Sequence, residues 1–469
     1  MHPESINLTQ QPRAVVIGAG VCGLYAALTL VRAGRPVTVL EKETFLGGLA
    51  ASPSVNGTPH DFGVHMLHGF DEELLKDLLG LMGGDSHPVP LHASIRWRGH
   101  SFHYPLRFTD LIQVLSPTEL FRSISGLLLA GARARFSPPI HAADAEEALI
   151  ELYGEPLYEL FFETFTHRYW GIHPRMLSAT FVKSKMPRLS AVDAVRRVLR
   201  RIGLPVRQPS VESALEDEIL HYSKNGAATL PESIAREIRR LGGEILTDCQ
   251  ITRIEHSGEV IQQLHFLHAG HERSLRPAEL ISTMPVGPFS MLFHPAPPPQ
   301  ITAAVERLRH RPMAVFGILV DKPQCKEALY TYYRDKIFHR ISEPKNAGLA
   351  VQPADATLLI VEVMCFSGDA VWEGDEAAWN QVITEAVAEG WFQPGQILSR
   401  NHARAEYAYP VFDKGFDSNL SELQEWLDQF QQVRSTGRQG GFCYPNMHTA
   451  MRMGEKSATA VSKAQVAVI

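Results

Sequence analysis

The sequence predicts an α/β fold on three observations. An apolar strand, a glycine turn and an uncharged helix occupy residues 14–31, and a second strand follows at 36–41. Helical periodicity then dominates 71–215, after which strand-like segments alternate with helices. A glycine-rich turn leading into a helix returns near residue 437. This order predicts a Rossmann-type domain built from discontinuous segments, interrupted by a helical insertion and a mixed β-sheet.

The first turn has the glycine spacing of a dinucleotide-binding motif. Gly18 is placed for the tight turn, Gly20 for close approach of the backbone to a pyrophosphate, and Gly23 for packing of the helix on the strand. Glu41, about twenty positions on, is placed for a ribose. Residues 14–31 are also long and apolar enough for a membrane span, but turn-spaced glycines and the lack of a basic flank beyond Arg13 argue against it.

A second glycine pair, Gly47 and Gly48, follows the acidic residue. Nicotinamide-binding domains do not usually need such a pair, whereas enzymes that hold an extended FAD have a loop of this kind close to the cofactor. Just beyond it, His65 and His68 bracket a short apolar pair. These features favour FAD as the nucleotide.

Composition narrows the class of protein. The 469 residues exceed one ordinary core, so two or three domains are expected. A net charge of -6 gives no electrostatic footprint for nucleic acid or an anionic membrane. The first ten residues lack the features of a signal peptide, which predicts a cytoplasmic protein. Five scattered cysteines without CxxC spacing predict neither a disulfide framework nor a metal site.

Pattern changes along the chain predict an interleaved organisation. The expected units are FAD-binding segments at 1–70, 216–288 and 406–469, a helical substrate or cap domain at 71–215, and a β-rich substrate domain at 289–405. Periodicity predicts helices at 73–81, 145–153, 232–241 and 420–433, and strands at 242–255, 279–285, 313–320 and 357–365. The apolar run 124–132 is too short to span a membrane and is expected in a homodimer contact or a core helix.

Four separated stretches resemble the FAD-dependent amine oxidase and protoporphyrinogen oxidase superfamily, and within it most resemble the UDP-galactopyranose mutases. The opening glycine motif is shared by the whole superfamily and implies FAD. The other three are more specific, and they are Gly-Val-His-Met-Leu-His at 63–68, Leu-Tyr-Glu-Leu-Phe-Phe through Trp-Gly at 157–171, and Gly-Arg-Gln-Gly-Gly-Phe-Cys-Tyr-Pro-Asn-Met at 437–447. The resemblance implies a flavoenzyme with a GR2-like FAD-binding domain.

The resemblance also implies residues around the flavin. His65 is expected to hydrogen-bond the flavin O4 or N5, the alternative being a hydrogen-bonded core histidine. Gly437 and Arg438 are expected at the last FAD-binding turn, where the guanidinium faces the pyrimidine carbonyls; a surface salt bridge is the alternative. Asn446 and Met447 are expected to open the closing helix, whose N-terminus then faces the cofactor.

On the substrate side the resemblance is less complete. Trp170 is a candidate stacking wall for a base or sugar, with plain core packing as the alternative. Mutases carry an arginine that clamps the diphosphate where this chain has Lys185, which can neutralise a phosphate but not bind it bidentately. Arg340 resembles a diphosphate ligand of eukaryotic mutases, and Tyr332 and Arg334 join it as candidate ligands.

Two enzymatic hypotheses follow. The first is a redox-neutral, mutase-like enzyme acting on a nucleotide sugar through the flavin N5, which requires prior flavin reduction by a reductant such as NAD(P)H. The second is an oxidoreductase of the protoporphyrinogen oxidase or amine oxidase type that removes hydride from an amine, a polyene or a sugar-like substrate. The altered sequence at 183–226 favours the second. A non-enzymatic flavin-binding protein would not need a histidine and arginines directed at the ring.

Overall fold

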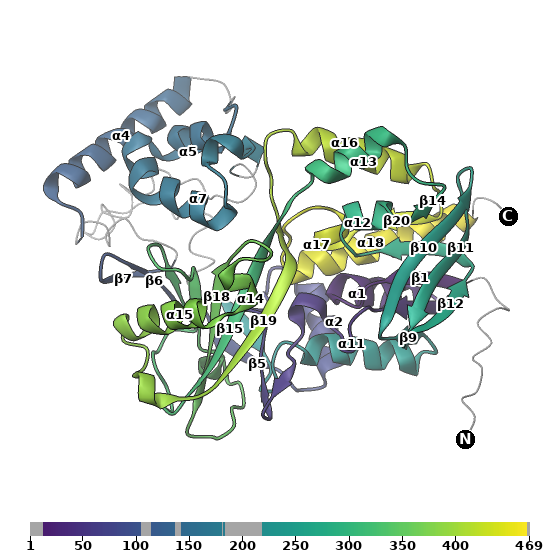
Figure 1. Cartoon of the computed structure of the whole chain (residues 1–469), viewed down its shortest axis with the longest axis horizontal. Helices are drawn as coiled ribbons and strands as arrows, with labels where there is room; N and C mark the ends of the chain where they lie inside the picture. Colours follow the sequence, from purple (N-terminus) through teal and green to yellow (C-terminus); the bar gives the residue numbers. More distant parts are fainter. Residues whose placement is uncertain (1–12, 105–113, 137–141, 181, 183–217, 467–469) are drawn as a thin grey trace.

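The computed structural model describes residues 13–104, 114–136, 142–180, 182 and 218–466. Three parts can be followed in Figure 1. A five-stranded sheet with its covering helices and a smaller sheet lies on the right, a seven-stranded sheet lies at lower left, and a group of helices lies above that sheet.

The five-stranded sheet is parallel throughout and has the strand order β20-β13-β1-β2-β9. Its strands come from the start, the middle and the end of the chain, as the sequence predicts for a discontinuous nucleotide-binding domain. They are β1 (Arg13–Ile17), β2 (Val37–Leu40), β9 (Glu244–Leu246), β13 (Pro277–Ser282) and β20 (Val433–Ser435).

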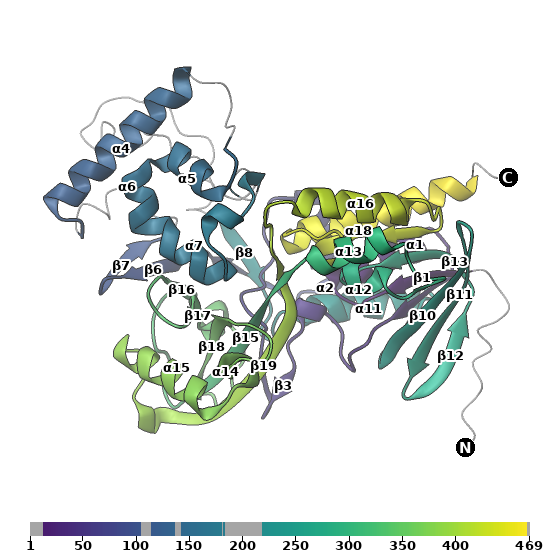
Figure 2. The same cartoon turned by 45° about the horizontal axis from the view of Figure 1, so that its top comes forward.

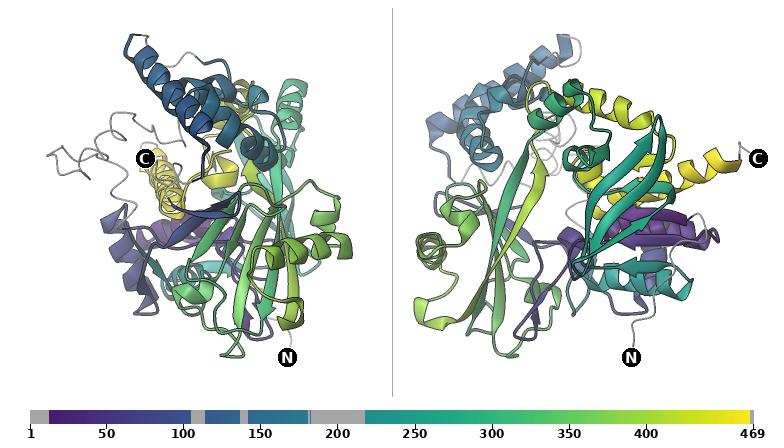
Figure 3. Two further views of the ribbon diagram at one scale, coloured as in Figure 1. Left: turned by 90° about the vertical axis from the view of Figure 1, so that its left-hand side faces the viewer. Right: turned by 45° about the vertical axis from the view of Figure 1, so that its right-hand side comes forward.

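Helices cover this sheet, and their buried residues share one core with β1 and β2. They are α1 (Val21–Arg32), α2 (Glu72–Met82), α11 (Thr229–Arg240) and α18 (Met447–Val466). The first and last of these pack together, and Figure 3 shows them beside the sheet in two further views. Gly454 permits their approach, because a Cβ at that position would lie 2.3 Å from the carbonyl oxygen of Cys22.

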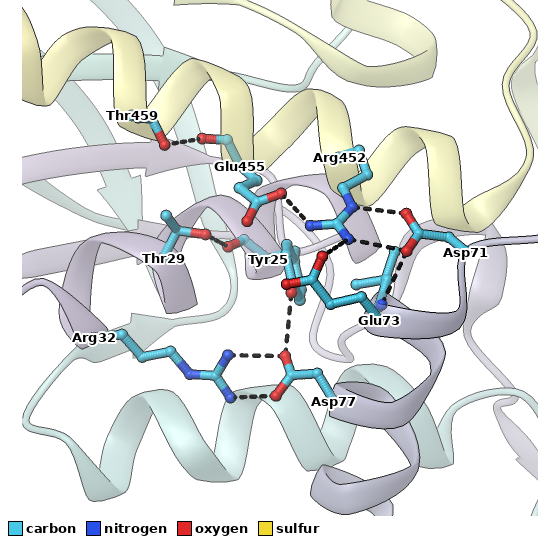
Figure 4. Close-up of polar contacts among 10 residues, drawn as sticks. Tyr25, Thr29, Arg32, Asp71, Glu73, Asp77, Arg452, Glu455 and Thr459 are labelled. Carbon is cyan, nitrogen blue, oxygen red and sulfur yellow. Dashed lines mark hydrogen bonds and ion pairs between the residues drawn. The ribbon is translucent and has the colours of Figure 1, made fainter.

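Helix α2 corresponds to the predicted helix 73–81, but it packs on α1 and α11 and not within the helical insertion where the sequence placed it. Figure 4 shows the polar contacts that hold it there. Asp71 caps α2 by accepting from the Leu74 N–H at 3.0 Å, and it also pairs with Arg452 of α18 through two bonds of 2.8 and 2.9 Å. Asp77 pairs in the same way with Arg32 of α1. These partners are far away in the sequence, so local periodicity did not reveal them.

A four-stranded sheet of order β12-β11-β10-β14 adjoins the nucleotide-binding part. Its strands are β10 (Cys249–Ser257), β11 (Val260–His268), β12 (His271–Leu275) and β14 (Phe293–His294). The single strand predicted at 242–255 is therefore two strands in two different sheets, since β9 joins the parallel sheet and β10 joins this one. Asp248 turns the chain between them with φ of +53°.

The seven-stranded sheet has the order β19-β15-β18-β17-β16-β6-β7 and is antiparallel except where β16 pairs with β6. Two of its strands, β6 and β7, come from the predicted helical region. Its members are β6 (Ala93–Trp97), β7 (His100–His103), β15 (His310–Val320), β16 (Tyr330–Tyr333), β17 (Arg340–Ser342), β18 (Thr357–Met364) and β19 (Ile397–Pro410). Helix α15 (Glu376–Ala388) packs its buried residues against this sheet in a separate apolar core.

The helical group consists of α4 (Pro117–Phe136), α5 (Ala145–Tyr153), α6 (Glu155–Leu157), the π-helical turn η2 (Tyr158–Phe162) and α7 (Glu163–Trp170). Figure 2 shows it extending away from the nucleotide-binding part. The apolar run 124–132 lies in α4, where Leu127 and Ala130 are buried but Leu128 and Leu129 are exposed, so α4 is not a core helix along its whole circumference. Among the described residues no helix has the length and apolar character needed to cross a membrane.

Three further helices join the nucleotide-binding part. Residues 286–307, placed mainly in the predicted β-rich domain, instead form α12 (Val286–Ser290) and α13 (Pro299–Arg307), of which α13 packs on α16 (Phe416–Asp428). The predicted helix 420–433 begins earlier, at Phe416, and ends at Asp428, because a turn at 429–432 leads into β20. The remaining short elements are β3 (Ser54–Val55), β4 (Thr58–Pro59), β5 (His87–Pro90), β8 (Ile219–Tyr222), α14 (Ala370–Glu373), α17 (Gly437–Gly440), η1 (Gly48–Ala50), η3 (Pro174–Met176), η4 (Pro344–Ala347) and η5 (Pro394–Gln396).

Candidate functional site

The turn between β1 and α1 has the form of a phosphate cradle. Gly18 has φ of +97°, and a Cβ on Gly23 would lie 2.0 Å from the Gly18 carbonyl oxygen, so both positions require glycine. Gly20 precedes α1, and the nearest atom to a Cβ built there is the Gly47 carbonyl oxygen at 3.9 Å. No acidic side chain lies in the first turn of α1. The N–H groups of this helix start are thus available to an anion such as a pyrophosphate.

Glu41 lies at the end of β2, beside this turn. It is 6 % exposed, and burial raises the pKa of its carboxyl group. Its two oxygens accept from the N–H groups of Ala19 at 2.6 Å and Glu43 at 3.0 Å. Each carboxylate oxygen can accept a further hydrogen bond, so the geometry leaves acceptor capacity for ribose hydroxyls.

The second glycine pair lies directly against the first turn. Gly47 forms a backbone bridge with Gly20, and its N–H donates to the Ala19 carbonyl oxygen at 2.9 Å. A Cβ on Gly48 would lie 3.4 Å from the Gly20 Cα. The glycines of two loops therefore meet at the start of α1. Together with Glu41, these loops fit the adenosine diphosphate half of FAD.

His65 lies on the loop that follows, close to groups from two other chain segments. Burial lowers the pKa of its imidazole to about 4, with the guanidinium groups of Arg340 and Arg438 lowering it and the carboxylate of Glu362 raising it. Its buried Nδ1 has no hydrogen-bond partner among the described residues. The Gly63 backbone opposes this lowering, but His65 is still a neutral imidazole at neutral pH, and its Nδ1 is left for a ligand.

Arg340 and Glu362 form a buried ion pair beside His65. They stand opposite each other on β17 and β18, and the guanidinium donates to the two carboxylate oxygens at 2.6 and 2.7 Å. This pairing holds the pKa of Glu362 at about 2. Arg340 also donates through Nη1 to the Tyr332 hydroxyl at 3.2 Å. Glu362 therefore occupies the Nε–Nη2 edge of Arg340, and this edge is not free to bind a diphosphate.

Arg438 reaches the same region from α17. It donates through Nε and Nη2 to the Ala408 carbonyl oxygen at 3.1 and 2.8 Å. Its guanidinium lies 4.2 Å from the ring centroid of Tyr444 and 4.8 Å from that of Tyr409. No carboxylate of the described residues pairs with it, so the alternative of a surface salt bridge does not apply.

Tyrosine side chains lie beside His65, Arg340, Glu362 and Arg438, and together these residues form the wall of the site. The rings of Tyr409 and Tyr444 are 5.0 Å apart, and that of Tyr169 is 5.4 Å from Tyr409. Burial raises the pKa of Tyr169, Tyr332 and Tyr409, so these hydroxyls stay protonated and can donate. The site combines several neutral donors with two guanidinium groups and one carboxylate.

The remaining flavin-side candidates lie at the end of the chain. Gly437 has φ of +80°, and a Cβ there would lie 2.7 Å from the Cys22 Sγ, which places this turn against α1. Asn446 immediately precedes α18 and Met447 begins it, in agreement with the sequence prediction of the helix start. Their contacts with the cofactor stay a prediction.

One substrate-side candidate, Trp170, is placed differently from the expectation, and a second, Lys185, cannot be placed. Trp170 is only 3 % exposed and packs against Tyr409 and Phe412, so the geometry favours the core alternative and makes Tyr169 the ring nearer to the site. Lys185 lies outside the described residues. Arg334 follows β16, and its guanidinium lies against the rings of Phe161 and Trp97.

Sequence reasoning missed Glu362, which is the lone charged residue in the apolar strand β18. A single carboxylate in such a run is a usable signal, since buried charges are normally paired. Tyr409 gave no comparable signal, because it is one of several aromatic residues near the end of a long strand. No cluster of three metal-ligating side chains occurs in the part of the chain that the structure describes.

Comparison with known proteins identifies a family. Residues 21–440 match the family described as flavin containing amine oxidoreductase. Protoporphyrinogen oxidase 2, chloroplastic/mitochondrial, of Arabidopsis thaliana is 23 % identical over 99 % of this chain and 95 % of its own length.

Solved structures show the same fold. A reduced UDP-galactopyranose mutase superimposes with a TM-score of 0.80 and 20 % identity over 97 % of this chain and 94 % of its own. A putrescine oxidase bound to putrescine gives 0.66 and 16 % identity over 97 % of this chain and 100 % of its own. The chain therefore belongs to the flavin containing amine oxidoreductase family, and it is a flavoenzyme with FAD as its cofactor.

Proposed function

We propose that this flavoenzyme acts on a nucleotide sugar in a redox-neutral, mutase-like reaction at the flavin N5. The observation that carries the proposal is the chemistry of the wall around His65. Phenol hydroxyls and guanidinium groups surround it, and the one carboxylate acting on it, Glu362, is neutralised by Arg340. Such a wall suits a polyhydroxylated, negatively charged ligand.

The charge balance disfavours a cationic substrate. Of the three charged groups acting on His65, the Glu362 carboxylate and the Arg340 guanidinium cancel, and the positive charge of Arg438 remains. An amine protonated at neutral pH would meet this charge, and among the described residues that act on His65 there is no free carboxylate to pair with it. A phosphate or a reduced, anionic flavin ring would be stabilised by the same arrangement.

Bound FAD supplies the nucleophilic or hydride-accepting centre of the reaction. In this proposal Arg438 faces the pyrimidine edge of the ring, where it stabilises negative charge. The neutral His65 donates or accepts one hydrogen bond at the ring through its unpaired nitrogen. The hydroxyls of Tyr332 and Tyr444 orient sugar or phosphate oxygens, and the surrounding buried side chains exclude water.

A second candidate is an oxidoreductase of the protoporphyrinogen oxidase type that removes hydride from its substrate. Two observations favour it: the pairing of the Nε–Nη2 edge of Arg340 with Glu362, which leaves less of this arginine for a diphosphate, and the similarity to an Arabidopsis protoporphyrinogen oxidase over nearly the whole chain. In that reaction the flavin is reduced by the substrate and must be reoxidised by an acceptor.

Product analysis separates the two candidates. Purified FAD-loaded protein is incubated anaerobically with UDP-galactopyranose, once with dithionite-reduced and once with oxidised flavin, and the nucleotide sugars are separated by chromatography. The proposal predicts a new sugar isomer with the reduced protein alone. Turnover that needs oxidised flavin, with loss of the yellow colour when a substrate is added, would reject the mutase reaction and favour the oxidoreductase.

A further inference from the structure

A second cationic site lies between β16 and the helical group. Arg334 immediately follows β16, and its guanidinium lies 4.5 Å from the ring centroid of Phe161 and 5.4 Å from that of Trp97. One hydrogen bond, from Nη2 to the Leu160 carbonyl oxygen, is long at 3.5 Å. Its Nε is buried with no partner among the described residues. Burial and the nearby Arg168 lower the pKa of Arg334 to about 9.

Arg168, on α7, is the second cation of this site. Its Nη2 donates to the Tyr333 carbonyl oxygen at 3.2 Å, and burial lowers its pKa. In the described part of the chain neither Arg168 nor Arg334 has a carboxylate within ion-pair distance. The nearest acidic groups are Asp335, which is exposed, and Glu385, whose carboxylate accepts from the Ile337 N–H at 2.7 Å. Two poorly compensated, half-buried cations close together are unfavourable unless an anion joins them.

A small cavity lies among Arg168, Tyr169 and His339. Its volume is about 20 Å³, and it is lined by Phe165, Arg168, Tyr169, Ile337, His339 and Met364. His339 is 4 % exposed; its Nε2 lies 3.5 Å from Glu362, while its buried Nδ1 has no partner among the described residues. The cavity is therefore bordered by Arg168 and by two residues, Tyr169 and His339, that neighbour Tyr409 and Glu362.

From this geometry we infer that Arg168 and Arg334 bind a compact oxyanion, a phosphate or a carboxylate, on the substrate. The inference rests on the proposed function, and it names the group that holds the end of the substrate remote from the flavin. Two planar guanidinium groups offer several N–H donors that match the oxygens of such an anion. Arg340, whose fork is paired with Glu362, then acts mainly within the wall beside the ring.

The structural alternative is that Arg334 stabilises the fold by stacking on the rings of Phe161 and Trp97. The two roles predict opposite effects of Arg334→Met on the protein without an added anion. If stacking stabilises the fold, the variant melts at a lower temperature. If the cation is a receptor, removing this half-buried charge without a carboxylate partner leaves the melting temperature unchanged or raises it.

The test measures binding of inorganic pyrophosphate, UDP and succinate to oxidised, FAD-loaded protein by calorimetry, together with thermal unfolding in low-salt buffer. Wild type is compared with Arg168→Met and Arg334→Met, and Arg122→Met on the exposed face of α4 is the matched control. We expect at least one of these anions to bind wild type and Arg122→Met equally. Binding to the other two variants should weaken about tenfold to hundredfold, while their anion-free melting temperatures do not fall.

The pattern of ligands identifies the source of the anion. Preference for pyrophosphate and UDP indicates a phosphate, and preference for succinate indicates a carboxylate. No binding to wild type, equal binding to all variants, or a lower anion-free melting temperature for Arg334→Met would overturn the inference. Anion binding that depends on the arginine pair, without conversion of a nucleotide sugar, would uphold the inference and reject the proposed function. Conversion of a nucleotide sugar that is unchanged in Arg168→Met and Arg334→Met would uphold the proposed function and reject the inference.

Discussion

The ion pair between Arg340 and Glu362 permits a quantitative prediction. Glu362 is 1 % exposed, and replacing it by glutamine keeps its shape while removing the charge that balances Arg340. Loss of one partner of a buried pair destabilises a protein by about 3–5 kcal/mol, because the other charge is left without compensation. We expect this loss for Glu362→Gln at neutral pH, where the carboxyl group with its pKa of about 2 is ionised.

The corresponding change in melting temperature follows from the size of the chain. Unfolding entropy of about 2.1 cal/mol/K per residue gives roughly 1 kcal/mol/K for 469 residues that unfold as one unit. The variant should therefore melt about 3–5 °C lower. If the seven-stranded sheet unfolds separately, the smaller unit gives a larger decrease. Differential scanning calorimetry of the FAD-loaded protein measures both the shift and the number of transitions.

A double-mutant cycle supplies the control. Arg340→Met alone should also destabilise the protein, since it leaves Glu362 buried and unpaired. The double variant removes both charges, so its loss should be smaller than the sum of the two single losses by more than 1 kcal/mol. Strictly additive losses, or an unchanged melting temperature for Glu362→Gln, would refute the buried pairing.

Three further predictions concern His65, the first glycine turn and acid stability. His65→Ala should retain FAD, as measured by the flavin absorbance per protein, and should lose most turnover, because the unpaired nitrogen near the ring is gone. Gly20→Ala has room for its Cβ but places it where the cofactor's phosphates approach, so it should fold and bind FAD at least about tenfold more weakly in a fluorescence titration. Its counterpart Gly23→Ala, whose Cβ would meet a backbone oxygen at 2.0 Å, should instead fail to fold stably. The ion pair with Arg452 holds the pKa of Asp71 at about 2, below its unfolded value of about 3.9, so this stabilisation is present above pH 4 and is lost between about pH 4 and 2, as acid unfolding should show.

Matched variants serve as controls for these predictions. His68→Ala, at the other histidine of the loop, should leave turnover largely intact; equal loss in both variants would remove the special role of His65. Normal FAD affinity of Gly20→Ala would mean that the cofactor phosphates do not approach this turn. Asp71→Asn should flatten the acid dependence of stability, and an unaltered acid transition would show that the pair with Arg452 contributes little.

Local features were predictable from the sequence, and features that depend on distant partners were not. The turn at Gly18 and Gly23 follows from contacts within a few residues, so its motif was sufficient. Helix α2 was recognised as a helix, but its place was not, because it is fixed by Arg452 at the far end of the chain. The break at Asp248 was hidden, since a residue with positive φ need not be glycine.

The site shows the same division. Motifs indicated His65 and Arg438, which the structure brings close together although they are more than 370 positions apart in the sequence. They could not show that the fork of Arg340 is taken by Glu362, because strand pairing decides which side chains stand opposite each other. Nor could they distinguish Trp170 from Tyr169, since adjacent residues on a helix face different surroundings.

The most direct test of this site is a crystal structure of the FAD-loaded protein. The measured quantity is the distance from the flavin ring to the side chains of His65 and Arg438. We predict a nitrogen of each within about 3.2 Å of a ring oxygen or nitrogen, which is hydrogen-bond distance. A ring bound elsewhere, with both side chains out of reach of it, would contradict the account.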